Sequence, residues 1–165
     1  MRGKMQQRPF TGAAGFTLVE LVIVLIVAGI LAAVGASRYF VLQDFQERGF
    51  YDDTLAAVRY AQKLAVASGC DIEVSVSPAG YGLLGRPGCT TGAFSVAVRK
   101  PGAGGPFTGA PPSGVTVGTM QFYYDQLGRP IDPASNAVLT TNPSVVIGGR
   151  TPRTIIVEHE TGFVH

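Results

Sequence analysis

The hydrophobic pattern divides the chain into three stretches with different periods. Residues 16–36 are apolar except for Thr17 and Glu20, hydrophobic residues recur at helical spacing over residues 37–69, and apolar and polar residues alternate from residue 71 onward. A helix rises about 1.5 Å per residue, so the first stretch is long enough to span the ~30 Å hydrocarbon core of a bilayer. We therefore predict a membrane-spanning helix at 16–36 that continues as an amphipathic helix over 37–69.

The rest of the chain is predicted to be a β-rich globular domain at 70–165. Its expected strands share alternating or β-branched residues bounded by turn-forming residues, and they lie at 71–77, 81–84, 94–98, 115–125, 144–147, 153–158 and 163–165. The glycine- and proline-rich segment 99–114 is too poor in apolar residues to be buried, so we expect an exposed loop there. The predicted fold class is α+β, with a long N-terminal helix packed on a C-terminal antiparallel β-sheet domain.

The residues before the apolar stretch are basic and end in a glycine. Residues 1–15 contain Arg2, Lys4 and Arg8 but no acidic residue, which places this end in the cytoplasm by the positive-inside rule. A secretory signal peptide has its cleavage site after the apolar run, whereas here the candidate site at Gly15 precedes it. Cleavage there would leave the anchor on the mature protein, with the globular domain on the periplasmic side of the inner membrane.

A single carboxylate, that of Glu20, lies within the apolar stretch. An ionisable group in a membrane costs at least ~2.5 kcal/mol and is therefore a candidate functional residue. The run GFTLVEL around Glu20 resembles the class III signal of type IV prepilins and type II secretion pseudopilins, G-F-T-L-x-E-L. The resemblance implies that a prepilin peptidase cuts between Gly15 and Phe16 and N-methylates Phe16, and that Glu20 meets the amino terminus of a neighbouring subunit during assembly. An ordinary transmembrane anchor with a tolerated glutamate is the alternative.

Three later segments extend the resemblance to the rest of the chain. They read GFYDDTLAAVRYAQKLAVASGC, FYYDQLGRP and TIIVEHETGFVH. With the anchor, they resemble the minor pilin and pseudopilin group that includes GspH and FimT, and most of all the minor pilins of the mannose-sensitive haemagglutinin (MSHA) pilus. The resemblance implies a type IV pilin-like fold and a minor pilin that is incorporated into, or primes assembly of, an MSHA-type filament.

The same resemblance implies a set of partners and a location. The partners are the prepilin peptidase, the other major and minor pilins of the filament, inner-membrane lipid before assembly and the inner-membrane assembly platform. The location is the bacterial inner membrane, with a single pass and a periplasmic globular domain, and afterwards the pilus filament. A type II secretion pseudopilin is the alternative, because both machines read the same signal.

Cys70 and Cys89 are the only cysteines. The predicted topology puts both in the periplasm, an oxidising compartment that favours a disulfide. This disulfide would close a loop of about 20 residues and stabilise the fold by ~3 kcal/mol on the chain-entropy model. Two free thiols are the alternative, and two cysteines alone make a poor metal site.

The distribution of charge tests whether the protein could bind nucleic acid, which is a function of a different class. The formal net charge is +2, but residues 1–15 hold three of the 13 basic residues and none of the 11 acidic ones, so the remaining side chains are nearly balanced. FimT-type DNA-uptake pilins carry G-R-x-R near the C-terminus, and GRTPR is a looser version in a predicted turn between two strands. Arg150 and Arg153 are therefore candidate DNA contacts, although a polar hairpin turn is favoured because non-specific affinity needs several phosphate contacts.

The sequence does not predict an enzyme. His159 and His165 lie close in the sequence, but no cysteine or carboxylate cluster with metal-ligand spacing accompanies them. Asp52 and Asp53 are adjacent on a predicted helix, where neighbouring side chains diverge, so a solvated face is favoured over acid–base or metal chemistry. The glycine-rich segment lacks the lysine and following helix of a phosphate-binding loop. No cofactor or metal is expected.

Overall fold

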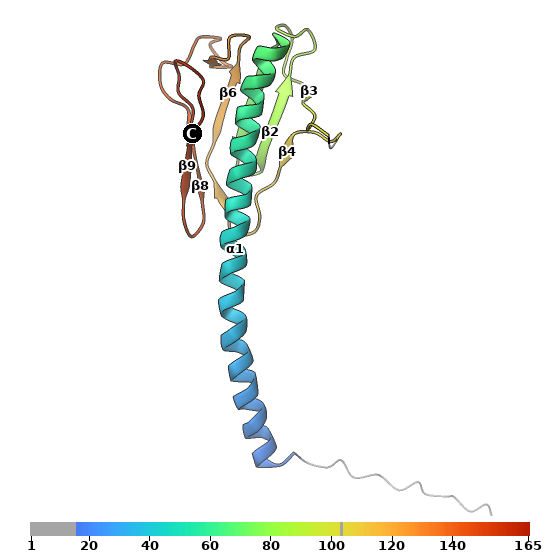
Figure 1. Cartoon of the computed structure of the whole chain (residues 1–165), viewed down its shortest axis with the longest axis vertical. Helices are drawn as coiled ribbons and strands as arrows, with labels where there is room; N and C mark the ends of the chain where they lie inside the picture. The colour runs from blue at the N-terminus through green and yellow to red at the C-terminus, as the bar shows by residue number, and fades with distance from the viewer. Residues whose placement is uncertain (1–15, 103) are drawn as a thin grey trace, which may run out of the picture. The chain divides into compact units, whose positions relative to one another are not determined.

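The computed structural model describes residues 16–102 and 104–165, without the side chains of residues 34–42. The chain divides into two compact units, Met1–Phe40 and Val41–His165, and each is considered by itself. The described part of the first unit is helical from Leu18 onward, and the second unit contains the rest of that helix and the strands (Figure 1).

The helix α1 spans Leu18–Ser68, a length of 51 residues. Thr17 caps its start, because the Thr17 hydroxyl accepts a hydrogen bond from the backbone N–H of Glu20 at 3.2 Å. Gly69 ends it with a φ of 66°, a left-handed conformation that glycine adopts without strain. The single long helix expected from the sequence is therefore confirmed, and it continues through Gly49 without a break.

The predicted membrane segment 16–36 lies in the first unit. The side chains of residues 34–36 at its end fall outside the described ones. Among the described residues, no helix is long and apolar enough to cross a membrane. The membrane assignment therefore stays a prediction.

The strands of the second unit form two sheets in which neighbouring strands are antiparallel (Figure 1). The main sheet has the order β3-β2-β1-β6-β7, with β4 also paired to β2, and its strands are β1 (Ile72–Ser77), β2 (Gly80–Gly85), β3 (Val96–Ala97), β4 (Thr108–Gly109), β6 (Met120–Tyr124) and β7 (Pro130–Ile131). The second sheet has the order β5-β8-β9, with strands β5 (Thr116–Val117), β8 (Ser144–Gly148) and β9 (Arg153–Ile156). The expected antiparallel domain is confirmed.

The centre of the main sheet is strand β1, and its inward residues form the core. Val74 pairs with Leu83 of β2 on one side and with Phe122 of β6 on the other, and all three side chains are buried. Alternate residues of a strand point to the same face, so the remaining inward positions of β1 also enter the core. The hydrophobic effect on this face holds the sheet against the helix.

The second half of α1 covers this core with one face. The buried members of that face recur every three or four residues and are Glu47, Phe50, Thr54, Ala57, Val58, Ala61 and Ala65. The buried hydroxyl of Thr54 donates a hydrogen bond to the carbonyl of Phe50 at 2.7 Å, so its polar group is satisfied. Short side chains such as Ala57 and Ala61 let the helix approach the sheet closely.

The expectation that segment 99–114 is an exposed loop was wrong in part. Phe107 is buried and stacks on Tyr60 of α1, with 5.1 Å between the ring centroids. The adjacent β4 pairs with β2, and the Phe107 carbonyl accepts a hydrogen bond from the Leu83 backbone N–H at 3.2 Å. One aromatic side chain and a free sheet edge are thus enough to anchor a segment of low overall hydrophobicity.

The expected strand 115–125 is two strands in two different sheets. β5 belongs to the second sheet and β6 to the main one. They separate at Gly118, whose backbone N–H donates to the Val146 carbonyl of β8 at 2.9 Å. A Cβ at Gly118 would lie 3.3 Å from a methyl group of Val145, so glycine permits a close approach that a period-two pattern does not reveal.

Candidate functional site

The start of α1 carries the residues that the sequence singles out. Phe16 precedes the helix and is 81% exposed, while Glu20 is exposed in the first turn. The Thr17 cap fixes this turn, and an acidic side chain there interacts favourably with the positive end of the helix dipole. Gly15, the other half of the predicted cleavage site, lies outside the described residues.

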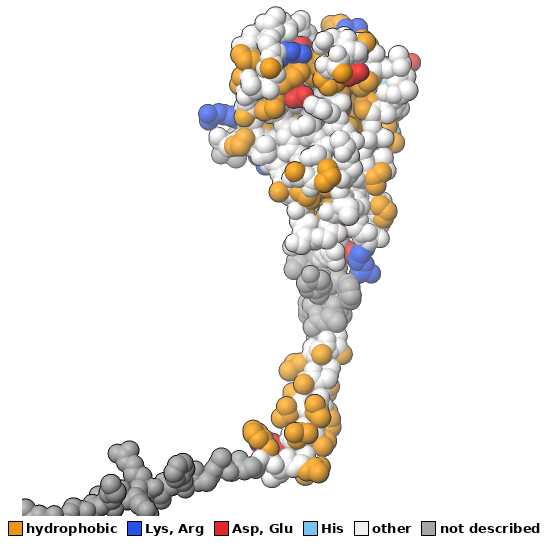
Figure 2. Space-filling model, turned by 180° about the vertical axis from the view of Figure 1, so that it is seen from behind, with side chains coloured by type: hydrophobic (Ala, Val, Ile, Leu, Met, Phe, Trp, Pro, Cys, Tyr) orange, Lys and Arg blue, Asp and Glu red, His pale blue; other side chains and the backbone are white. Residues whose placement is uncertain are grey.

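The N-terminal turns of α1 expose apolar side chains on the face that Figure 2 shows. The exposed apolar residues 21–27 are consecutive and span almost two helical turns, so they cover every side of the helix. The exposed large hydrophobic residues of this segment are Leu18, Val19, Leu21, Val22, Ile23, Val24, Leu25, Ile26, Val27, Ile30 and Leu31. A helix that is apolar all round is typical of a membrane or of the interior of an assembly. Burying one such side chain fully contributes roughly 1.5–3 kcal/mol. Removal of this surface from water, against lipid or against other apolar side chains, is therefore strongly favourable.

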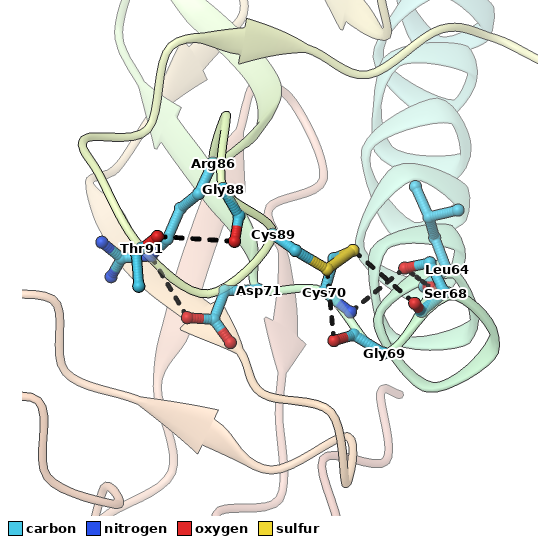
Figure 3. Close-up of a disulfide and its surroundings, with 9 residues drawn as sticks. All are labelled: Leu64, Ser68, Gly69, Cys70, Asp71, Arg86, Gly88, Cys89 and Thr91. Carbon is cyan, nitrogen blue, oxygen red and sulfur yellow. Dashed lines mark hydrogen bonds and ion pairs between the residues drawn. A yellow bond between two sulfur atoms is a disulfide. The ribbon is translucent and has the colours of Figure 1, made fainter.

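The other end of α1 is tied to the globular unit by a disulfide (Figure 3). Cys70 and Cys89 are bonded, with 4.5 Å between their Cα atoms, so the end of the helix is joined to the segment that follows β2. The Cys89 backbone carbonyl also accepts a hydrogen bond from the Asp71 N–H at 3.0 Å. No free cysteine is left. The predicted disulfide is therefore present, and the alternative of two free thiols is wrong.

Arg86 organises the same region, and the sequence analysis did not identify it. Its guanidinium lies 3.9 Å from the centre of the Phe94 ring and 5.2 Å from that of Tyr123, and its Nε is 3.1 Å from an Asp71 carboxylate oxygen (Figure 3). Burial raises the pKa of Asp71, and Arg86 opposes that rise. Only the position of Arg86 directly after a strand hinted at this role.

The two candidate DNA contacts lie at the β8–β9 turn, close to acidic groups of α1. The guanidinium of Arg150 is 3.9 Å from a carboxylate oxygen of Asp44, and its backbone N–H donates to Glu47 at 3.0 Å. Arg153 lies over the Tyr51 ring, 5.5 Å from its centre. The structure thus brings both arginines beside the helix, where neighbouring carboxylates reduce the attraction of this turn for phosphate.

Glu47 is a residue that the sequence analysis missed. It is only 3% exposed and lies three residues before Phe50, at the spacing of the buried helix face. The sequence did contain a signal, because Glu47 falls at a position of the helix that is otherwise occupied by buried apolar residues. An acidic side chain at such a position needs polar partners, and these mark it as a residue of interest.

The histidines take part in a small polar network at the last turn. His159 donates its backbone N–H to Asn142 Oδ1 at 2.9 Å, and its ring Nδ1 lies 2.7 Å from the same oxygen. His165 Nδ1 is 3.8 Å from Glu158. In the part of the chain that the structure describes, no group of three or more His, Cys, Asp or Glu side chains is arranged to hold a metal ion.

Comparison with known proteins bears on this site and on the fold. The family described as "Prokaryotic N-terminal methylation motif" matches residues 11–36. The type IV narrow pilus major component PilA5 of Thermus thermophilus is 40% identical over 73 residues, which are 41% of this chain and 62% of that protein. The chain therefore matches about three fifths of the length of this relative.

Two crystal structures of the type IV minor pilin FimU of Pseudomonas aeruginosa share the fold. The P21 form has a TM-score of 0.52 and covers 74% of this chain and 89% of FimU, and the P65 form has a TM-score of 0.50 and covers 72% and 90%. Sequence identity is 12% in both, so this likeness concerns the fold. The matched proteins are structural pilins and not enzymes. The chain has the type IV pilin fold and carries the prokaryotic N-terminal methylation motif.

Proposed function

We propose that this chain is a minor pilin that is cleaved between Gly15 and Phe16, N-methylated on Phe16 and built into a type IV filament. One observation carries the proposal. Directly after the methylation motif's Phe16, α1 exposes an apolar surface on all sides that holds one carboxylate, Glu20. No catalytic or ligand-binding role requires such a surface, whereas an anchor that later becomes a filament core does.

The same surface serves two environments in turn. Before assembly, inner-membrane lipid covers the helix, with the globular domain in the periplasm. During assembly the helix exchanges lipid for the helices of neighbouring pilins, so little apolar surface meets water at any stage. Partners at these steps are the prepilin peptidase, the inner-membrane assembly platform and the other pilins.

Glu20 supplies specificity to this exchange. A carboxylate in an apolar interior is strongly disfavoured unless a cation pairs with it. Cleavage creates an α-amine at Phe16, and the amine of the adjacent subunit is the cation that reaches Glu20 in a low-dielectric environment. Only axial positions that bring the two charges together are then stable, so Glu20 sets the stagger between subunits.

Within this class we favour a minor pilin of an MSHA-type pilus. The segments around residues 49–70, 122–130 and 154–165 support it by their resemblance, and the fold of the minor pilin FimU agrees with a minor pilin. A type II secretion pseudopilin shares the anchor and remains the competing assignment. FimT-like DNA uptake is less favoured, because acidic groups of α1 lie beside Arg150.

The test compares Glu20→Ala with Glu160→Ala, a matched change of an exposed acid on the globular domain. Both variants of the full chain should reach the membrane and lose residues 1–15 normally. The Glu20 variant should fall at least tenfold in filaments sheared from the cells, because removing one partner of a buried ion pair costs about 3–5 kcal/mol. Equal amounts of the two variants in filaments would contradict the proposed role.

A further inference from the structure

The side of α1 that faces away from the sheets carries a groove. The groove has a volume of about 390 Å³ and is lined by residues of α1, which are Asp52, Leu55, Ala56, Arg59, Tyr60 and Lys63. Successive residues of a helix turn by about 100°, so these positions centre on the side opposite the buried Thr54, Val58 and Ala61. In Figure 1 the sheets lie behind this part of α1, and no described segment lies in front of it. The groove is therefore open to a partner.

Contacts with the globular domain hold two side chains of the groove in place. Arg59 donates hydrogen bonds from Nε and Nη2 to the Val164 carbonyl, at 3.3 and 3.1 Å. Tyr60 stacks on Phe107, with 5.1 Å between the ring centroids. Neither side chain has to be ordered when a partner binds, which lowers the entropic cost of binding.

The charges of the groove change sign along the helix. Asp52 lies at its N-terminal end, Arg59 and Lys63 lie at its C-terminal end, and Ala56 lies between them. All four residues are exposed. Among the side chains that the structure describes, neither Asp52 nor Lys63 has an ion-pair partner. A surface with one acidic end and one basic end is complementary to a second copy of itself.

The relative direction of two copies decides which charges meet. Subunits that are anchored in one membrane and then joined in one filament point in the same direction. Two parallel helices in exact register would place Asp52 against Asp52 and Lys63 against Lys63, and both pairs repel. A displacement of seven residues, which is two turns or about 11 Å, instead places Asp52 of one copy opposite Arg59 of the other, with Lys63 one turn away.

The same displacement brings small residues together. It places Gly49 of one copy opposite Ala56 of the other, and both are exposed. Nothing lies within 4 Å of the position that a Cβ at Gly49 would occupy. Two helices can therefore approach closely at this point while the charges on either side of it pair.

We propose that the groove receives the same face of a second copy of this chain, which lies parallel to the first and is displaced by two helical turns. The ion pairs across this contact select the direction and the register of the two copies more than they add affinity. The inference rests on the proposed function, because the filament supplies the common direction of the subunits. It goes further by naming a contact between their globular domains.

The first test compares Asp52→Lys with Glu160→Lys in the full chain, expressed in cells that make the filament. Both changes reverse the charge of an exposed acid, but only the first places a lysine against Arg59 and Lys63 of the next copy. The Asp52 variant should be at least fivefold less abundant in sheared filaments than the control, with an equal level in the membrane. Adding Lys63→Asp to it should recover at least half of the lost abundance, because opposite charges then face each other again.

The outcomes of this test are distinct. Equal abundance of the two single variants would overturn the inference, and so would a double variant that recovers nothing. Asp52 and Lys63 are 11 residues apart on one helix, about 16 Å, so recovery cannot come from a contact within one chain.

The second test uses the unchanged chain. Filaments are treated with a carbodiimide, which joins a carboxylate and an amine in direct contact into an amide, and are then digested and analysed by mass spectrometry. We expect Lys63 linked to the segment 49–59 that contains Asp52, a link that the same 16 Å separation allows only between two copies. Lys63→Arg keeps the charge, so it should preserve incorporation and abolish the link. Filaments that contain the chain but no such link, or that link Lys63 only to other pilins, would overturn the inference.

The two proposals fail in different ways. If the unchanged chain is absent from filaments, the proposed function fails first. If the unchanged chain is incorporated but its copies are not linked through Lys63, the groove proposal alone is overturned.

Discussion

Replacing Gly162 with alanine should destabilise the globular unit strongly, because backbone conformation and surroundings both oppose a side chain there. Gly162 has a φ of 69°. A Cβ would lie 2.9 Å from the Tyr124 ring and 2.6 Å from Gln62 Nε2, and it would collide with the Gly128 carbonyl oxygen. A backbone carbonyl cannot move aside as the end of a flexible side chain can.

The expected cost follows from the interactions around the turn. A left-handed conformation costs a non-glycine residue about 1–2 kcal/mol. Moving the turn also weakens the hydrogen bond from the Tyr124 hydroxyl to the Gly162 carbonyl, at 3.0 Å, and those from Gln62 to Gly128 and Thr161, at 3.1 and 2.9 Å. Each contributes about 0.5–1.5 kcal/mol, so the total loss should be roughly 3–5 kcal/mol.

Gly69→Ala is the matched control. Gly69 has nearly the same φ, 66°, but nothing lies within 4 Å of its Cβ position. The Gly69→Ala variant should therefore lose only the conformational contribution to the free energy of unfolding, about 1–2 kcal/mol. Urea unfolding of the purified full chain in mild detergent, followed by tyrosine circular dichroism, gives the two free energies of unfolding. Equal losses would refute the packing part of the argument.

Two further predictions concern the same unit. Changing Cys70 and Cys89 together to serine should lower the free energy of unfolding by about 3 kcal/mol, because residues 19 apart are no longer linked; dithiothreitol should destabilise the native chain similarly and leave the double variant unchanged. Burial raises the pKa of Tyr124, so its contribution to stability is complete below pH ~10 and is lost as the pH rises above it, where the unfolded chain ionises and the folded one does not. Tyr124→Phe should cost about 1–2 kcal/mol at pH 7, because the Gly162 carbonyl loses its donor, and should make the alkaline fall in stability shallower; an equal fall in both proteins would exclude Tyr124 as a source of it.

Local patterns predicted the helix and the strands at 71–77 and 81–84 well, and these correspond to α1, β1 and β2. The apolar spacing of α1, its end at Gly69 and the β1–β2 hairpin all depend on residues close together in the sequence. Periodicity and turn chemistry report such elements directly. The Cys70–Cys89 pairing was predictable for another reason, because only one pairing of two cysteines exists.

Features that join distant parts of the chain could not be predicted in the same way. The separation of β5 from β6 depends on Val145 and Val146 approaching Gly118, and the burial of Phe107 depends on Tyr60. Neither neighbour is visible in a local pattern. A period-two stretch looks the same whether its two halves enter one sheet or two.

The candidate site shows the same division. Phe16 and Glu20 were identified because a short motif carries their role. Glu47 was missed, because its partner Arg150 is 103 residues away in the sequence and an acidic residue in a helix is most often solvated. Its burial became visible only in the folded structure.

The measurement that tests the central claim most directly is mass spectrometry of the N-terminal peptide of this protein in sheared filaments. The proposed function predicts a peptide that begins at Phe16 and carries one methyl group on its α-amine. A protein that is found in filaments with residues 1–15 still attached, or with an unmodified Phe16, would contradict the proposed processing. Absence from filaments of a chain that is stably expressed would contradict the proposed function itself.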